Sequence, residues 1–229
     1  MKRLLLPLLL SLFLIPAITT AQVILPEKEV TQIFTAAVKT QFNIQYPIFR
    51  VYKYIDKAGQ FYTVLTESRD SIGSNKDTIS HNIKAVTLKS ENGKLSKAWE
   101  LSDAADKAKK GEQAIWFWSK YIDFKDLDKD AMTEAIIVYG TEGANHFEDG
   151  RIGIVIFYKG QKTMVRQQNG TLDFERKLQV EKSFYALPKP IQHTVIEKMK
   201  ALAKKWQAIF PVGWEQAMAK KQTVITGKN

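Results

Sequence analysis

The chain has 229 residues, of which 45% are hydrophobic and 25% charged, a composition typical of folded globular proteins rather than disordered ones. Twelve Gly and seven Pro exclude a collagenous or low-complexity chain. The chain has no Cys, which excludes disulfides, iron–sulfur clusters, Cys-ligated zinc and thiolate catalysis. The net charge of +10 favours anionic partners, but no block of like charges marks a nucleic-acid-binding arm.

The first 21 residues have the pattern of a secretory signal peptide. Lys2 and Arg3 form a basic start, residues 4–15 are almost entirely apolar, and small residues precede Gln22. The apolar run is shorter than the about 20 residues that span a bilayer. We therefore expect a signal peptide over 1–21 and an exported, periplasmic or secreted protein with no transmembrane segment in its mature form. Loss of the two basic residues would leave a net charge of +8.

The first half of the mature chain predicts one helix followed by two hairpins. Pro26 suits a first helical turn, and apolar residues then recur at helical spacing up to Val38. From Tyr46 the pattern changes to short apolar strands separated by turn residues. The predicted strands cover 48–55, 61–66 and 83–89, and a fourth ends near Glu100.

The second half predicts four more strands and then helices. A charged, Ala-rich segment over 101–112, with one or two helical turns, precedes the most apolar part of the chain. The strands are predicted over 115–124, 134–139, 151–158 and 162–168. A short helix up to Pro188 and a longer one from Ile191 through Trp206 to Ile209 complete the chain.

This order of elements predicts the α+β class, because the helices lie at both ends of a run of strands with short connections. We expect a single domain over 22–229, in which the N-terminal helix and the C-terminal helices pack on one meandering, mainly antiparallel sheet. A domain boundary near 101–111 is the alternative. No Pro-, Gly- or Ser-rich linker divides the chain.

The clearest chemical pattern is an acidic loop between two predicted strands. Asp126, Asp128, Asp130 and Glu134 alternate with other residues, so their carboxylates can converge together with the carbonyl of Met132. A hard cation such as Ca²⁺ binds several oxygen ligands of this kind. Two interpretations stay open: these five residues bind calcium, or the loop is a solvated acidic turn balanced by neighbouring lysines.

The loop is not an EF-hand, because its twelfth position is Ile137 rather than Glu. It resembles the aspartate loops of FG-GAP and VCBS-type β repeats, which supply ligands from their first, third, fifth and ninth positions. That pattern has a glycine that turns the loop, whereas this chain has Ala131 at the same position. A left-handed conformation costs a non-Gly residue roughly 1–2 kcal/mol.

Residues 115–124 are rich in aromatic side chains. Alternation places Trp116, Trp118, Ile122 and Phe124 on one face of the predicted strand and Tyr121 on the other. Exposed aromatic rings bind sugars, but a strand with two apolar faces is more typical of a buried, central one.

The sequence predicts no catalytic residues. The three histidines lie in unrelated local contexts without metal-binding spacing, and His146 stands in a polar loop with Glu148 and Asp149. Such a carboxylate pair is commoner on a solvated loop than in a glycosidase site. No nucleophile elbow or phosphate-binding glycine loop occurs.

A wider resemblance covers residues 115–188, about a third of the chain. Its segments are WFWSKYIDFKDLDKD, IIVYG, EDGRIGIVIFYKG, RQQNGTLDFER and FYALP. These segments are similar to a family of exported bacterial proteins labelled as associated with surface polysaccharide biosynthesis. The resemblance implies a cell-envelope context and says little about mechanism.

We therefore expect an exported, non-catalytic accessory or binding protein of the bacterial envelope. Its expected partners are an anionic polysaccharide or another envelope component, and not nucleic acid. One alternative is an envelope glycan-modifying enzyme that uses a metal or carboxylate site. Another is an inhibitor or immunity protein whose basic surface blocks an acidic enzyme.

Overall fold

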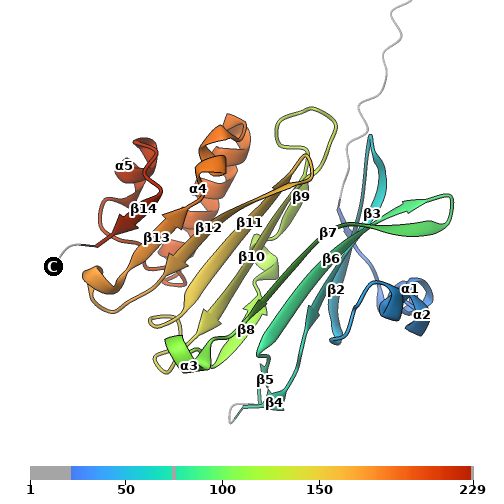
Figure 1. Cartoon of the computed structure of the whole chain (residues 1–229), viewed down its shortest axis with the longest axis horizontal. Coiled ribbons are helices and arrows are strands. Elements are labelled where there is room, and N and C mark those ends of the chain that lie inside the picture. Colours follow the sequence, from blue (N-terminus) through green and yellow to red (C-terminus); the bar gives the residue numbers. More distant parts are fainter. Residues whose placement is uncertain (1–21, 74–75, 228–229) are drawn as a thin grey trace, which may run out of the picture.

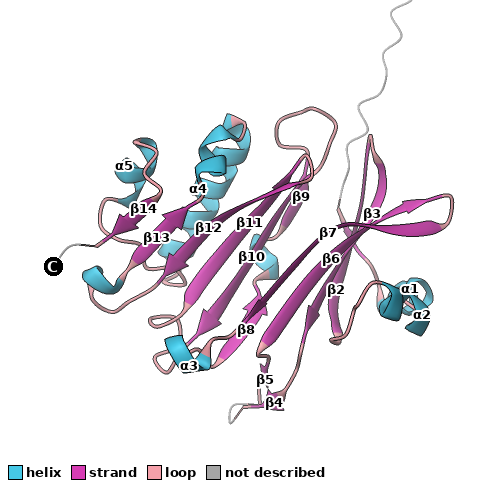
Figure 2. Ribbon diagram, viewed as in Figure 1, coloured by secondary structure: helices cyan, strands magenta, loops and turns pink. Residues whose placement is uncertain are grey.

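The computed structural model describes residues 22–227 except 74–75. Strands dominate, and helices lie towards both ends of the chain, so the predicted α+β class is confirmed (Figure 2). The prediction of one sheet is wrong: the strands form two large antiparallel sheets and a separate two-stranded one. The predicted signal peptide lies outside the described residues.

The first sheet has five strands in the order β1-β2-β3-β6-β7. They are β1 (Val23–Ile24), β2 (Ile48–Asp56), β3 (Gly59–Glu67), β6 (Asn82–Glu91) and β7 (Lys94–Ala104). The two predicted hairpins are confirmed as β2–β3 and β6–β7. The small sheet, β4 (Ser71–Ile72) with β5 (Thr78–Ile79), lies in the connection between β3 and β6.

The second sheet has the order β14-β13-β12-β11-β10-β8, and β9 also pairs with β10. Its strands are β8 (Ala114–Phe117), β9 (Asp123–Lys125), β10 (Glu134–Glu142), β11 (Arg151–Tyr158), β12 (Gln161–Gln168), β13 (Lys177–Val180) and β14 (Val224–Thr226). The predicted single strand over 115–124 is therefore two strands. A 3-10 turn, η1 (Ser119–Tyr121), separates them.

The helices are short, except for one near the C-terminus. They are α1 (Glu27–Ile33), α2 (Ala36–Gln41), α3 (Lys107–Lys110), α4 (Lys189–Lys204) and α5 (Trp214–Ala219), with 3-10 turns η2 (Asp173–Glu175) and η3 (Lys182–Ala186). The predicted N-terminal helix is split because Phe34 leaves the helical conformation and buries its ring, after which Thr35 caps α2. The long C-terminal helix ends at Lys204, and Trp206 is 76% exposed rather than part of its apolar stripe.

Three apolar clusters show how the layers stack. The middle cluster joins residues of both large sheets, among them Tyr52, Leu65, Phe124 and Val155. A second cluster packs α4 and α5 against the other face of the second sheet, and a third packs α1 and α2 against the first sheet. Figure 1 shows these helix pairs at opposite ends of the long axis, with the sheets between them.

The existence of two sheets follows from the central strands β10 and β11. In β10, Ile136 and Val138 join the cluster with the C-terminal helices, while Ile137 and Tyr139 join the cluster between the sheets. This is the alternation of a pleated strand. Because both faces are apolar, two layers must cover them, and the helices alone cover only one.

Candidate metal centre

The predicted acidic loop connects β9 to β10, as the sequence indicates. Lys129 and Ala131 both have positive φ values, of 63° and 67°. Ala131 stands at the position where the pattern of FG-GAP and VCBS-type loops has glycine. The backbone therefore adopts the left-handed turns without glycine, at a cost of roughly 1–2 kcal/mol for each residue.

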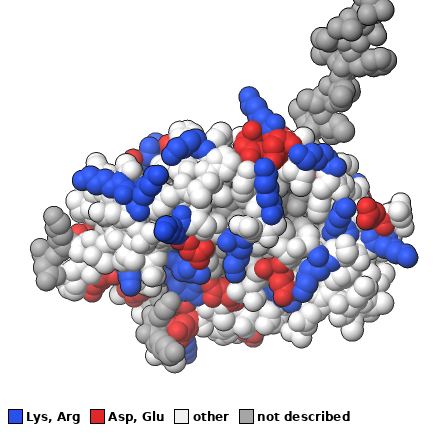
Figure 3. All heavy atoms as spheres, turned by 45° about the horizontal axis from the view of Figure 1, so that its top comes forward, with Lys and Arg blue, Asp and Glu red and all other residues white. Residues whose placement is uncertain are grey.

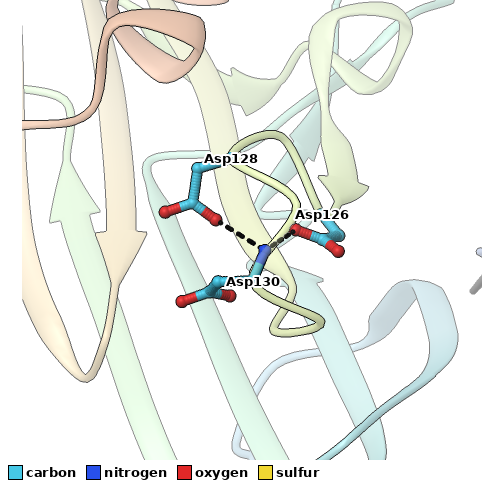
Figure 4. Close-up of side chains that lie close together, drawn as sticks. All are labelled: Asp126, Asp128 and Asp130. Atoms are coloured by element: carbon cyan, nitrogen blue, oxygen red, sulfur yellow. Dashed lines mark hydrogen bonds between the residues drawn. The ribbon is translucent and has the colours of Figure 1, made fainter.

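The three aspartates converge. One carboxylate oxygen of each of Asp126, Asp128 and Asp130 lies within 4.8 Å of the others. The backbone N–H of Asp130 donates to Asp126 Oδ1 at 3.1 Å and to Asp128 Oδ1 at 3.2 Å (Figure 4). The N–H of Ala131 donates to the second oxygen of Asp126 at 2.9 Å. The turn thus fixes the directions of the side chains through its own backbone.

The other two predicted ligands are adjacent but have separate contacts. Glu134, the first residue of β10, is buried and accepts a hydrogen bond from the N–H of Leu127 at 2.7 Å. Met132 donates its N–H to Asp130 Oδ1 at 2.9 Å. Among the described residues, the group of converging acidic ligand atoms contains the three aspartates and not Glu134. Glu134 and the Met132 carbonyl therefore stay predicted ligands.

The electrostatics of Glu134 reflect its position. Burial raises its pKa to about 7, and the nearby charges of Asp128, Asp126 and Asp130 add to this effect, whereas the Leu127 hydrogen bond opposes it. In contrast, a hydrogen bond from Lys159 lowers the pKa of Asp130. The loop therefore concentrates negative charge around a buried carboxyl, which a cation would stabilise in its ionised form.

Both sheets hold the loop in place. From the β2–β3 turn, the N–H of Lys57 donates to Ala131 O at 3.0 Å, and Asp56 accepts from Thr133 N at 3.0 Å. From the β11–β12 turn, Lys159 Nζ lies 2.9 Å from Asp130 Oδ2. Anchoring on both sides fixes the backbone, so less entropy is lost when the loop orders around an ion.

Asp123, just before the loop, does not belong to the acidic cluster. It pairs with Lys198 Nζ of α4 at 2.5 Å and with Lys125 Nζ at 3.2 Å. These two lysines therefore neutralise Asp123 rather than the loop. On the surface shown in Figure 3, Lys and Arg lie scattered among Asp and Glu side chains instead of gathering in one patch.

The polar loop that contains His146 lies at the opposite end of β10. A nine-residue strand spans roughly 25 Å, so the two loops do not form one site. His146 is exposed, with Nδ1 3.6 Å from Glu142, and Asp149 accepts the N–H of Asn145 at 2.9 Å. These contacts are those of a loop that stabilises its own turns.

The aromatic segment over 115–124 is buried, in agreement with its interpretation as core. Trp118 is 5% exposed and packs against Gly140, where an added Cβ would come within 2.2 Å of its ring. The predicted division of faces is wrong beyond Trp118, because η1 turns the chain over. Tyr121 therefore joins Trp118 in the helix-side cluster, whereas Phe124 lies between the sheets.

The sequence did not reveal a second charged cluster. Arg151 of β11 donates to Asp103 at 2.6 Å and 3.0 Å and to Glu112 at 2.7 Å, and Tyr139 also donates to Asp103 at 2.6 Å. The side chain of Glu112 is fully buried. The four residues of this cluster come from four segments of the chain, so no local spacing in the sequence could have predicted it.

Comparisons with protein families, with curated proteins and with solved structures found no match for this chain. In the part of the chain that the structure describes, no helix has the length and apolar character needed to cross a membrane.

Proposed function

We propose that this protein is an exported, non-catalytic binding protein of the bacterial envelope, whose aspartate loop binds calcium and contacts anionic surface polysaccharide. The convergence of Asp126, Asp128 and Asp130 on a backbone turn that both sheets anchor is the observation that carries the proposal. The envelope context and the polysaccharide are supported by the sequence resemblance and by the net charge of +10.

Calcium suits the loop better than other divalent ions. The available ligands are carboxylate and carbonyl oxygens, which favour hard cations, and no His or Cys belongs to the described cluster. Calcium accepts six to eight oxygens in flexible geometry, whereas Mg²⁺ requires a nearly ideal octahedron. Among the described residues, Lys159 forms an ion pair with Asp130 and Lys57 donates to the Asp130 carbonyl, so three carboxylates share two nearby ammonium groups.

Calcium also offers a way to bind a glycan. The three aspartates converge with one oxygen each, and the Met132 carbonyl and Glu134 would bring the set to five if each binds through one oxygen. Calcium accepts six to eight oxygens, so such a set leaves coordination positions for an external ligand. The carboxylate of a uronic acid can fill these positions, and nearby Lys57 and Lys159 would favour the same anion. The separation of the two polar loops at opposite ends of β10 disfavours the alternative of one enzymatic site built from both.

A thermal melt of the purified protein with calcium and with chelator tests the ion site. At 100 times its dissociation constant, calcium should stabilise the protein by about 2.7 kcal/mol, a midpoint increase of roughly 5–10 °C for this chain length. Asp126→Asn/Asp128→Asn should abolish the increase, because the amides remove two negative charges, while the amide oxygen at each position can still accept one backbone N–H. The matched control Glu91→Ala/Glu148→Ala removes two exposed charges elsewhere and should respond like the parent.

Sedimentation with covalently cross-linked alginate beads, with calcium and with chelator, tests the glycan. We expect retention on alginate with calcium, none on neutral dextran, and loss of retention in the Asp126→Asn/Asp128→Asn variant. Retention that depends neither on calcium nor on the two substitutions would contradict the proposed site. Release of sugar fragments by the purified protein would contradict the non-catalytic assignment.

A further inference from the structure

The C-terminal helices leave a groove between η3, α4 and α5, far along the chain from the acidic loop. It has a volume of about 370 Å³, within the range of about 300–1,000 Å³ of small-molecule sites. Figure 1 shows α4 and α5 together at one end of the molecule. Neither the sequence patterns nor the acidic loop account for this groove.

The walls of the groove are apolar and fixed. They are formed by Phe184, Tyr185, Ile196, Trp214 and Met218. Phe184 and Met218 are buried members of the core beneath the helices. The rings of Phe210 and Trp214 lie 4.7 Å apart and those of Phe184 and Tyr185 lie 5.4 Å apart, so the aromatic side chains are held before any ligand enters.

Most polar groups in the groove already have partners. Gln192 is buried, and its Nε2 donates to the carbonyl of Leu187 at 2.6 Å. The hydroxyl of Tyr185 donates to the carbonyl of Gln222. Besides the charged groups of the rim, His193 is the other polar side chain that lines the groove. This set is small for the many hydroxyls of a sugar, so the groove favours a ligand with an apolar body.

The rim of the groove carries positive charge. Lys189 and Lys221 line it, and in the described part of the chain neither ammonium group has a carboxylate within 4 Å. The acidic residue of the rim, Glu215, lies 3.5 Å from Lys200 and is balanced by it. The ammonium group of Lys189 has a long contact, of 3.5 Å, with Oε1 of Gln192, a neutral acceptor. An anionic head group would therefore find two cations without a carboxylate partner next to an apolar hollow.

We propose that this groove binds a free amphipathic anion, an aliphatic chain that ends in a carboxylate. The chain would lie between Trp214 and Ile196, and the carboxylate would face Lys189 and Lys221. This chemistry also occurs in acyl lipids of a bilayer. We favour the free molecule because the hollow lies between helices and has the volume of a small-molecule site.

Calorimetry of the full chain with decanoate, below its micelle concentration, tests the proposal. We expect saturable binding at one site and affinity about tenfold lower for decanol, which lacks the charge. Lys189→Glu/Lys221→Glu should weaken decanoate binding more than tenfold. The matched control Lys204→Glu/Lys205→Glu reverses two charges at the end of α4, outside the groove, and should bind like the parent.

Two further variants separate binding from folding. Ile196→Trp fills the groove and should abolish binding while circular dichroism and the melting midpoint stay close to those of the parent. Trp214→Phe should keep binding but lose the change in tryptophan fluorescence that decanoate produces. Absence of saturable binding, equal affinity for decanol, or unchanged binding by Ile196→Trp would overturn the proposal. So would tighter binding of glucuronate, or binding only to phosphatidylglycerol vesicles.

Discussion

The structure contains two clusters of acidic side chains that differ in how their negative charge is balanced. Between the sheets, Arg151 pairs with both Asp103 and Glu112 through several short hydrogen bonds. In the β9–β10 loop, Asp126, Asp128 and Asp130 converge, and among the described residues Lys159 is the lysine that forms an ion pair with one of these carboxylates. The first cluster carries its counter-ion within the chain, whereas the second has a deficit of positive charge that an external ion can supply.

Removal of the internal cation should have the largest effect on stability. Arg151→Ala leaves the buried carboxylate of Glu112 and the half-buried one of Asp103 without the cation that pairs with them, although each keeps one or more other hydrogen-bond donors. We expect a loss of about 3–5 kcal/mol in the free energy of unfolding, measured by urea denaturation. The control Arg166→Ala breaks an exposed pair with Glu181 and should cost less than about 1 kcal/mol. Equal losses would show that the internal cluster is no more important than a surface pair.

The internal cluster should also make the protein sensitive to acid. Burial raises the pKa of Asp103, but hydrogen bonds from Arg151 and Tyr139 outweigh burial and hold the pKa below its usual 3.8. The unfolded chain therefore binds more protons at low pH, so the stability that Asp103 provides above about pH 4 is lost as the pH falls through its folded pKa. Asp103→Asn should flatten this part of the pH profile, and an unchanged slope would assign it to other carboxyls.

In the cluster of the β9–β10 loop, removal of a charge should increase the stability of the protein. Without calcium, Glu134→Gln should raise the free energy of unfolding at pH 7.5 by about 1 kcal/mol, because it removes a buried charge among like charges. The same variant should weaken calcium binding about tenfold in a titration. Glu67→Gln is a matched control, since burial also raises the pKa of Glu67 and the carboxylate accepts one backbone N–H, from Phe117. Its calcium affinity should equal that of the parent.

The smallest expected effect concerns the backbone of the loop. Ala131 has a φ of 67°, so Ala131→Gly should raise the melting midpoint by the equivalent of about 1 kcal/mol. As a control, Ala201→Gly in α4 should lower the free energy of unfolding by about 1 kcal/mol, because glycine is unfavourable within a helix. A decrease in both variants would indicate that the loop does not keep its left-handed turn in solution.

The sequence predicted the cluster of the β9–β10 loop but not the cluster around Arg151. The reason is the separation of their residues along the chain. Asp126, Asp128 and Asp130 lie within five consecutive positions, so alternation alone predicts that they meet. Asp103 and Arg151 are 48 positions apart, and they meet only where β7 of one sheet faces β11 of the other. Pairing across sheets depends on topology, which no local spacing encodes.

Local patterns also determined the strands, the hairpins and the α+β class, because alternation and turn residues act over a few positions. The same patterns missed the break at η1, where tertiary packing turns Tyr121 to the helix side and Phe124 to the space between the sheets. They likewise overextended the last helix, since Trp206 continues the apolar spacing although α4 ends at Lys204.

Local spacing in the sequence was enough to predict the two hairpins, the longer strands of both sheets, the long C-terminal helix and the place where three carboxylates meet. It did not predict β13 and β14, and the short helix predicted before Pro188 is the 3-10 turn η3. The division of the strands into two sheets, the pairing of Arg151 with two acidic residues and the groove beside α5 became visible in the folded structure. The physical reason is that hydrophobic burial and charge pairing act between surfaces. Their partners are chosen when distant segments pack, after local preferences have already formed each element.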